Sequence, residues 1–386
     1  MSVGQISHIT SDAERARRYE ALRKVMEEEG QGAFVICSRG DEFVRGRVQY
    51  VSDIFQWAGR GFVVLPLDGD PVFVVDPLWG LGYAMQGGWL DDYRMPANAG
   101  KEIAGILSDL GLGSGKVGVV GLADITAVAD FEDMKAALPD ADFVDATDLF
   151  DDVRAIKSPE EIENVRETGR ILRTVFKALE AELRPGVREV DVLSEAHRLC
   201  RQLGCMEGIA LMGRPPFKSF TPGTNGVIEK DDVIVIDLEW GGPSGYWVEL
   251  RRVYSFEEPT SEQQGFWETR VESFAACVDA MKAGESSTSI LDARDRVYEK
   301  HGQSGKGILA YTAHGIGVDS LEPPWVPGKD RIMEENMVIN LHPSLKFDDP
   351  ERGLALGGIS IADNVLVTKN GGVRTTDPED EWIVLA

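Results

Sequence analysis

Along the first 150 residues, helix-like and strand-like patterns of hydrophobic and polar residues follow one another. The stretch AERARRYEALRKVMEEEG, residues 13–30, has the pattern of a charged amphipathic helix that ends at Gly30. The short apolar runs GAFVIC and KVGVVG predict buried strands, and GFVVLPLDGDPVFVV predicts a hairpin that turns at Asp68-Gly69-Asp70. We therefore expect an α/β domain in this part of the chain.

A second helix is predicted by KSPEEIENVRETGRILRTVFKALEAEL, residues 157–183. Ser158 is a good N-cap, Pro159 takes the first helical position and Glu161 completes a capping box. Because this start follows DLFDDVRAIK, we expect two domains, at 1–152 and 153–386. The rest of the second domain is predicted to contain helices at 189–203, 261–283 and 287–301 and strands at 233–254, 336–342 and 359–367.

Composition narrows the range of functions. The chain of 386 residues, with 43% hydrophobic and 27% charged residues, is typical of a soluble globular protein. A net charge of −25 without a basic stripe argues against nucleic acid and anionic membrane surfaces as partners. The four cysteines form no CxxC pair and no signal peptide or membrane span is found, so a reducing cytoplasm is expected.

The segment DDVIVIDLEWGGPSGYWVELRRVYSF holds a dense group of candidate site residues. Two strand-like runs flank a turn at 241–245, which is rich in glycine. A hairpin symmetric about Pro243 would place Asp237 opposite Glu249. Alternation along the strands would then put both carboxylates and that of Glu239 on one face.

Two carboxylates directly across a strand pair repel each other, so a buried pair needs a shared proton or a cation. A solvated sheet edge, or a salt bridge to Arg251 or Arg252, would meet the same need. His342 ends the strand-like run NMVINLHPSL, and His314 lies beside glycines in YTAHGIGVDSLEPPW. With a carboxylate, the two imidazoles would form a donor set suited to iron or zinc.

The order of these residues resembles the pita-bread enzymes, which include methionine aminopeptidase, aminopeptidase P, prolidase, creatinase and the dimethylsulfoniopropionate lyases. The shared pattern is an Asp, a second acid about eleven residues later, His-Gly-x-Gly, Glu-Pro and acids near the C-terminus. The resemblance covers nearly the whole chain, including RAIKSPEEIENVRETGRI and RPGVREVDV. It implies a creatinase-type α/β domain at 1–152 and an α+β pita-bread catalytic domain, with a curved antiparallel sheet, at 153–386.

Several ligand positions of the family are altered in this chain. The first Asp is Asp237, the second is Glu249 and the His is His314, whereas the two family glutamates have become His342 and Ala362. In the metallopeptidases the last Glu bridges two metal ions, so its loss argues against a dinuclear centre. The resemblance then implies one divalent ion of iron, zinc or manganese on Glu249, His314, His342 and Asp237, or no metal at all.

Other roles follow from the same resemblance. The candidate catalytic bases are the acids near the ligands, namely Asp237, Glu239 and Glu322. The candidate substrate contacts in this domain are Phe220, Tyr246 and Arg251.

Creatinase-like members complete the active site of a partner subunit with an aromatic and Arg segment of the N-terminal domain. The matching stretch here is VSDIFQWAGRGFVVL, which offers Trp57 for a cationic group and Arg60 for a substrate carboxylate. A homodimer acting on a small molecule is therefore expected. A core role for Trp57 and a surface role for Arg60 are the alternatives.

Three functions are compatible with these residues. The first is an enzyme that hydrolyses a C–N bond in a small carboxylate-bearing, non-peptide metabolite, or eliminates a leaving group from it, with a single metal ion. The second is a metal-free, creatinase-like hydrolase, and the third is an inactive pita-bread binding protein. Creatine hydrolysis and proline-directed peptide cleavage are both disfavoured, because Phe220 and Leu321 stand where the family has histidines.

Overall fold

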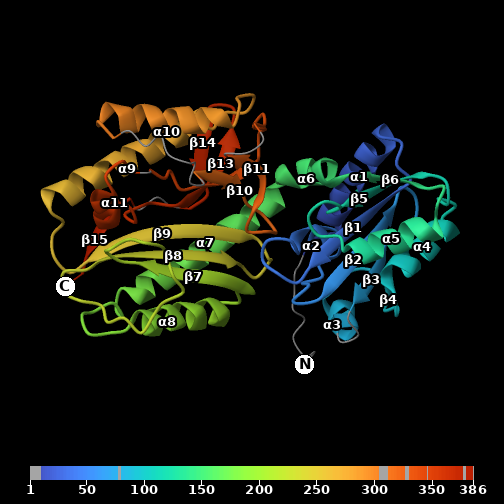
Figure 1. The fold of residues 1–386 in the computed structure, drawn as a ribbon, viewed down its shortest axis with the longest axis horizontal. Helices are drawn as coiled ribbons and strands as arrows, with labels where there is room; N and C mark the ends of the chain where they lie inside the picture. Colours follow the sequence, from blue (N-terminus) through green and yellow to red (C-terminus); the bar gives the residue numbers. More distant parts are fainter. Residues whose placement is uncertain are drawn as a thin grey trace. The chain divides into compact units, whose positions relative to one another are not determined.

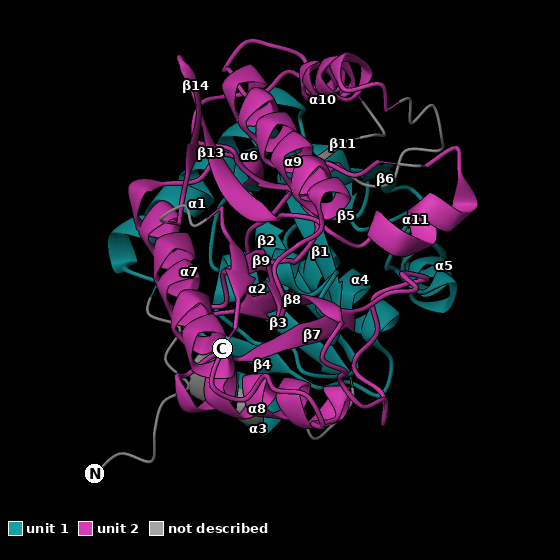
Figure 2. Ribbon diagram, turned by 90° about the vertical axis from the view of Figure 1, so that its left-hand side faces the viewer, with its two compact units in different colours: residues 1–154 teal, residues 155–386 magenta. Residues whose placement is uncertain are grey.

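The computed structural model describes residues 10–76, 80–303, 312–326, 330–345, 347–376 and 380–385. The chain divides into two compact units, Met1–Arg154 and Ala155–Ala386, which have different colours in Figure 2. This division lies two residues beyond the boundary expected from the sequence. In the ranges described, no helix is long and apolar enough to cross a membrane.

The first unit has the α/β architecture expected from its alternating patterns. Its strands form one sheet in the order β4-β3-β2-β1-β5-β6, in which β1, β2 and β3 are antiparallel neighbours and the other pairs are parallel. The strands are β1 (Ala33–Arg39), β2 (Arg60–Pro66), β3 (Val72–Asp76), β4 (Asp92–Arg94), β5 (Lys116–Val120) and β6 (Asp142–Asp145). The helices are α1 (Asp12–Glu28), α2 (Gly46–Ser52), α3 (Gly80–Gly87), α4 (Ala99–Asp109), α5 (Val128–Ala137) and α6 (Thr147–Ala155).

The second unit opens with the predicted helix, α7 (Pro159–Leu179). Its capping box is present, because the Ser158 side chain accepts the amide hydrogen of Glu161 and the Glu161 side chain accepts that of Ser158. Further helices in this unit are α8 (Glu189–Gln202), α9 (Ser261–Ala280), α10 (Thr288–Lys300) and α11 (Pro350–Leu356).

Two sheets lie between these helices (Figure 1). The first, in the order β15-β9-β8-β7, packs against α7 and α8, and the second, in the order β11-β10-β12-β13-β14, packs against α9. Strands of the first sheet are β7 (Glu207–Gly213), β8 (Val233–Gly241), β9 (Trp247–Ser255) and β15 (Trp382–Val384). Those of the second are β10 (Ala313–Gly315), β11 (Glu322–Val326), β12 (Val338–Leu341), β13 (Asp363–Thr368) and β14 (Gly371–Arg374).

The register of the β8–β9 hairpin differs from the prediction. Asp237 pairs with Arg251 and Glu239 pairs with Glu249, so the centre of symmetry is Ser244 instead of Pro243. The partner strand is thereby shifted by two residues, which preserves the face on which each side chain lies. The three acids therefore share one face as expected, although different pairs lie directly opposite.

Strand β9 also contacts the second sheet, which brings the site residues of the two sheets together. The Asn340 side-chain amide on β12 donates to the Glu249 carbonyl at 3.1 Å. The Arg251 amide donates to the carbonyl of Ala362 at 3.3 Å, and Ala362 lies just before β13 instead of in the middle of a strand. These links fix β9 against the ends of β12 and β13.

Candidate active site

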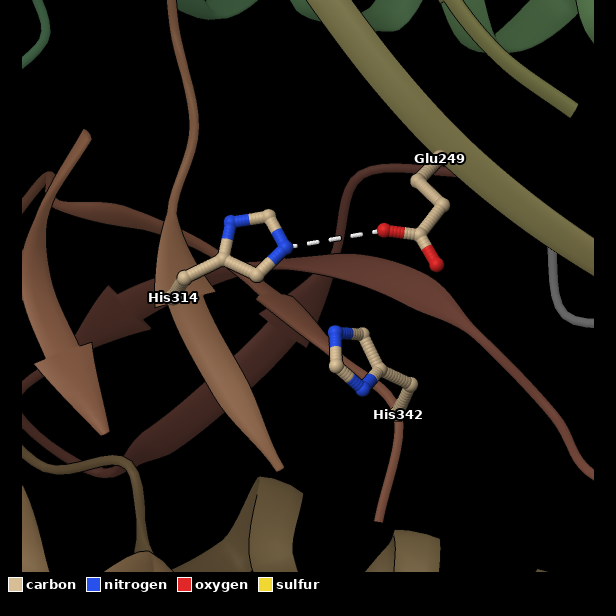
Figure 3. A group of neighbouring side chains, drawn as sticks. All are labelled: Glu249, His314 and His342. Atoms are coloured by element: carbon tan, nitrogen blue, oxygen red, sulfur yellow. Dashed lines mark ion pairs between the residues drawn. The ribbon is translucent and has the colours of Figure 1, made fainter. Parts of the chain in front are cut away.

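Three buried side chains from separate segments of the second unit converge at one point (Figure 3). Glu249 projects from β9, His314 from β10, and His342 follows the end of β12. One possible ligand atom from each residue lies within 4.8 Å of the other two. The side chains that the sequence grouped as ligands are thus neighbours in space.

The hydrogen bond of His314 determines which ring nitrogen faces the site. Its Nδ1 lies 2.9 Å from the carbonyl oxygen of Gly315, and a carbonyl can only accept, so Nδ1 carries a proton. In the neutral ring Nε2 therefore presents a lone pair, 3.5 Å from Oε2 of Glu249. Two acceptors at this distance need a proton or a metal ion between them, and a backbone bond to the other ring nitrogen is typical of metal-binding histidines.

His342 supplies the second imidazole. Its ring centroid lies 5.4 Å from that of His314, and the residue is only 8% exposed. Burial lowers the pKa of His342 to about 3, so the ring is neutral near pH 7 and has a lone pair available for an ion.

Glu249 supplies the negative charge of the group. Burial acts to raise its pKa, but the interactions with His342, Arg251 and His314 outweigh burial and lower it to about 2. Because His342 is itself neutral near pH 7, the standing positive charge beside Glu249 comes from Arg251, whose guanidinium lies 2.9 Å away. Glu249 is therefore ionised and available as an anionic ligand.

Asp237, the fourth expected ligand, is engaged by Arg251. Nε of Arg251 donates to Oδ2 of Asp237 at 2.8 Å, and the aromatic ring of Phe220 lies 5.1 Å from the guanidinium carbon. The other oxygen, Oδ1, is buried without a hydrogen-bond partner among the residues that the structure describes. Burial and the charge of Glu249 raise the pKa of Asp237 to about 7, while Arg251 opposes the rise.

Glu239 lies directly across the strand pair from Glu249 and is half-buried. The hydroxyl of Ser320 donates to Oε1 of Glu239. Burial, together with the neighbouring charges of Glu249 and Asp237, raises the pKa of Glu239 well above its usual range. Ser320 was not singled out in the sequence, although it lies six residues beyond His314 in the same segment.

Glu322, the third expected base, takes part in a closed ion pair. Its Oε2 lies 2.7 Å from Nζ of Lys157, and both side chains are 1% exposed. Its Oε1 accepts the amide hydrogens of Val318 at 2.8 Å and Asp319 at 3.2 Å. Oε1 therefore fixes the loop between β10 and β11, and Oε2 links it to Lys157. Because Lys157 is 165 residues away in sequence, no local pattern could indicate this pair.

The remaining expected contacts occupy other places. The hydroxyl of Tyr246 donates to Glu161 at 2.5 Å, which joins the hairpin to α7. In the first unit, Arg60 forms ion pairs with Asp76 and Asp130, and Trp57 is 51% exposed. Their expected role in a partner subunit remains a prediction.

The donor set fits one metal ion better than two. Glu249, His314 and His342 offer two nitrogens and an oxygen, a combination that zinc, iron and manganese sites use. A second ion would need donors at Asp237, which is held by Arg251, and at Ala362, which has none. The single-ion site expected from the sequence stays a prediction, which the contacts of Asp237 and the methyl side chain of Ala362 favour over a dinuclear centre.

Two family descriptions match the chain. Residues 18–156 match the creatinase/prolidase N-terminal domain, and residues 163–369 match metallopeptidase family M24. The chain is 27% identical over 325 residues to the "Putative dipeptidase YkvY" of Bacillus subtilis, which covers 81% of this chain and 86% of that protein. It is 25% identical to the "Xaa-Pro dipeptidase" of Pyrococcus furiosus, over 69% of this chain and 75% of that protein.

Solved structures show the same fold over almost the full length. The X-Pro aminopeptidase of Thermotoga maritima has a TM-score of 0.81 at 19% identity and covers 95% of this chain and 99% of its own. Dipeptidase PepE of Mycobacterium ulcerans has a TM-score of 0.80 at 21% identity, with 97% and 99% covered. Such low identities establish the pita-bread fold alone.

These relatives correct the function expected from the sequence. The prediction of an enzyme for a non-peptide metabolite is wrong, because the similar proteins are named dipeptidases and Xaa-Pro dipeptidases. The lyase, metal-free and inactive alternatives find no support among them. The changes at two ligand positions, His342 and Ala362, disfavoured a peptidase, whereas the similarity over most of the chain favours one. With residues 163–369 matched and the N-terminal domain in place, this chain belongs to metallopeptidase family M24.

Proposed function

We propose that this protein hydrolyses the amide bond of a short peptide with the help of one divalent metal ion held by Glu249, His314 and His342. The observation that carries the proposal is the convergence of the Glu249 carboxylate with one ring nitrogen each of His314 and His342, all within 4.8 Å of one another, a spacing that one metal ion can bridge. The names of the relatives support the substrate class, since several are Xaa-Pro dipeptidases. Dipeptides with a C-terminal proline are therefore the first substrates to examine.

An ion bound there would polarise the carbonyl of the scissile bond and lower the pKa of a bound water molecule. The chain itself holds the donor atoms in place. Gly315 orients the ring of His314, and Arg251 orients the carboxylate of Glu249. The burial of all three donor side chains limits competition from bulk water.

We assign the role of general base to Glu239. It lies opposite Glu249 in the β8–β9 ladder, so its carboxylate faces the space beside the ligands. The hydroxyl of Ser320 holds that carboxylate in one orientation. The other two candidate acids, Asp237 and Glu322, are less suited because the guanidinium of Arg251 and the buried ammonium of Lys157 already engage them.

The C-terminal carboxylate of a dipeptide needs a cation of its own. Arg251 is held inside the site by two acids, so we retain Arg60 of the partner subunit, with Trp57 of the partner subunit beside it, as the carboxylate site of a homodimer. Arg60 is itself paired with Asp76 and Asp130, but its side chain is 32% exposed, and the dipeptide carboxylate would take the place of one of these acids. Phe220 covers Arg251 and offers an apolar ring for a proline side chain.

The test is hydrolysis of Ala-Pro and Ala-Ala by purified protein before and after dialysis against a chelator, with metal content measured in parallel. We expect cleavage of at least one dipeptide, its loss with the metal, and its recovery when Mn²⁺ or Zn²⁺ is returned. Undiminished hydrolysis by metal-free protein would contradict the metal site. Failure of fully metallated protein to cleave any dipeptide would contradict the substrate class.

A further inference from the structure

The guanidinium of Arg251 lies between two buried carboxylates of the site. One terminal nitrogen is 2.7 Å from Oδ2 of Asp237 and 2.9 Å from Oε1 of Glu249. The β8–β9 register places Arg251 directly opposite Asp237, and the ring of Phe220 covers the outer side of the guanidinium. This position is thus set by the sheet and by packing, and does not depend on a mobile surface side chain.

One donor that a metal ion in the place of Arg251 would need is missing, because residue 362 is an alanine. Its backbone amide is bonded to the carbonyl of Ala362, so the fully buried methyl group of Ala362 belongs to the same corner of the site. Oδ1 of Asp237 has no hydrogen-bond partner in the part of the chain that the structure describes. The corner therefore offers anionic oxygen atoms to one fixed cation, and that cation is the guanidinium.

The contacts and the charge of Arg251 oppose a second ion here. A divalent ion at Oδ2 of Asp237 and Oε1 of Glu249 would compete with the guanidinium, which bonds both of these oxygen atoms. It would also lie within a few ångströms of a permanent positive charge in a buried place, where repulsion is weakly screened. The first ion would lie at the other oxygen of the same carboxylate, since Nε2 of His314 is 3.5 Å from Oε2 of Glu249 whereas Arg251 bonds Oε1.

We infer that Arg251 takes the place of a second metal ion, so that the protein binds one divalent ion per chain. The guanidinium, instead of an ion, holds the carboxylates of Asp237 and Glu249 together. This inference rests on the proposed function for the first ion. Arg251 is then a positioning residue, since it acts through Glu249. It also determines the number of ions that the site accepts.

The experiment counts bound Mn²⁺ by titration and elemental analysis and examines its electron paramagnetic resonance spectrum, in four forms of the full chain. Wild type and Ala362→Glu are both expected to bind about one equivalent, with the spectrum of an isolated ion, because the guanidinium remains. The double variant Arg251→Gln/Ala362→Glu is expected to bind about two equivalents, with a spin-coupled spectrum, since the guanidinium is gone and a carboxylate has been added.

A matched control is Arg252→Gln. Arg252 is the next residue on β9, is buried on the opposite face, and donates to the carbonyl of Arg251. Its replacement removes the neighbouring guanidinium but leaves Asp237 and Glu249 bonded to Arg251 as before. We expect about one equivalent of Mn²⁺ in this variant.

The outcomes separate this inference from the proposed function. Two equivalents in wild type or in Ala362→Glu would overturn the inference and leave the first ion in place. A folded double variant that still binds one equivalent would overturn it as well. If the double variant does not fold, the counts in wild type and Ala362→Glu decide the question. No bound Mn²⁺ in wild type would remove the proposed function itself.

Discussion

Two buried glutamates in the second unit have opposite surroundings. Glu322 is 1% exposed and has an ammonium group on one oxygen and two amide hydrogens on the other. Glu249 is 3% exposed and faces two imidazoles, and Nε2 of His314 lies 3.5 Å from Oε2 of its carboxylate. The first carboxylate has its charge and its hydrogen bonds satisfied, whereas the second still presents an oxygen to other acceptors.

This difference separates a structural charge from a functional one. A buried ion pair with all its hydrogen bonds made is stable only as a pair, and it adds nothing that a ligand could use. A buried carboxylate beside two imidazoles is a preformed set of ligands for a cation. Burial and residue type are alike at the two sites, so the partners alone distinguish them.

The largest expected effect comes from removing the open carboxylate. Glu249→Ala deletes the only anionic donor of the three, so Mn²⁺ binding should be lost and dipeptide hydrolysis should fall by about 10⁴-fold. Steady-state kinetics and metal analysis measure both effects. Glu249→Asp is the control, since it retains the charge and should retain weakened binding. Wild-type activity in Glu249→Ala would contradict the role of Glu249 as a metal ligand and thus its difference from Glu322.

The second effect concerns stability at the closed site. Lys157→Met leaves the buried charge of Glu322 without its ion pair, which should lower the free energy of unfolding of the second unit by about 3–5 kcal/mol. Denaturant unfolding measures this loss. The double variant Lys157→Met/Glu322→Met should recover much of it, and native Lys157→Met should still bind about one Mn²⁺. If Lys157→Met were as stable as wild type but no longer bound Mn²⁺, Glu322 would be the functional carboxylate, and its assignment as a structural one would be wrong.

A smaller effect is expected at the base. Ser320→Ala removes the hydroxyl that orients Glu239, so kcat should fall by about 10- to 100-fold while Mn²⁺ affinity stays unchanged. Ser320→Thr keeps the hydroxyl and serves as the control. An unchanged kcat in Ser320→Ala would remove the support for Glu239 as the base.

The smallest effect is a pH dependence of the metal-free protein. The pKa of His342 is about 3 in the folded state, below its ordinary value of about 6.5 in an unfolded chain. Below pH 6.5 the unfolded chain therefore binds a proton that the folded state does not, and stability is lost as the pH falls toward 3. The contribution is at most about 1.4 kcal/mol per pH unit. Melting temperatures between pH 7 and 5 should fall less steeply in His342→Asn, and an equal slope in the two proteins would contradict the neutral, buried ring.

Local signals in the sequence were sufficient for much of the fold. The capping box at Ser158 and Glu161 marked the start of α7, and the alternation around the hairpin placed Asp237, Glu239 and Glu249 on one face. The register was wrong because a turn rich in glycine allows several centres of symmetry, and a shift of two residues leaves the pattern of faces unchanged.

Contacts between distant segments were the part that sequence patterns missed. Lys157 and Glu322 are 165 residues apart, and neither has a neighbour in sequence that indicates the pairing. The substrate class was missed for another reason. Changes at two ligand positions, His342 and Ala362, were given more weight than the family pattern of the whole chain.

The most direct test of the metal site is anomalous diffraction from crystals grown with Mn²⁺, with data collected on both sides of the manganese absorption edge. We predict one anomalous peak per chain, within about 2.0–2.3 Å of Nε2 of His314, of a nitrogen of His342 and of a carboxylate oxygen of Glu249. An empty space between these three side chains, with manganese bound elsewhere or nowhere, would contradict the account.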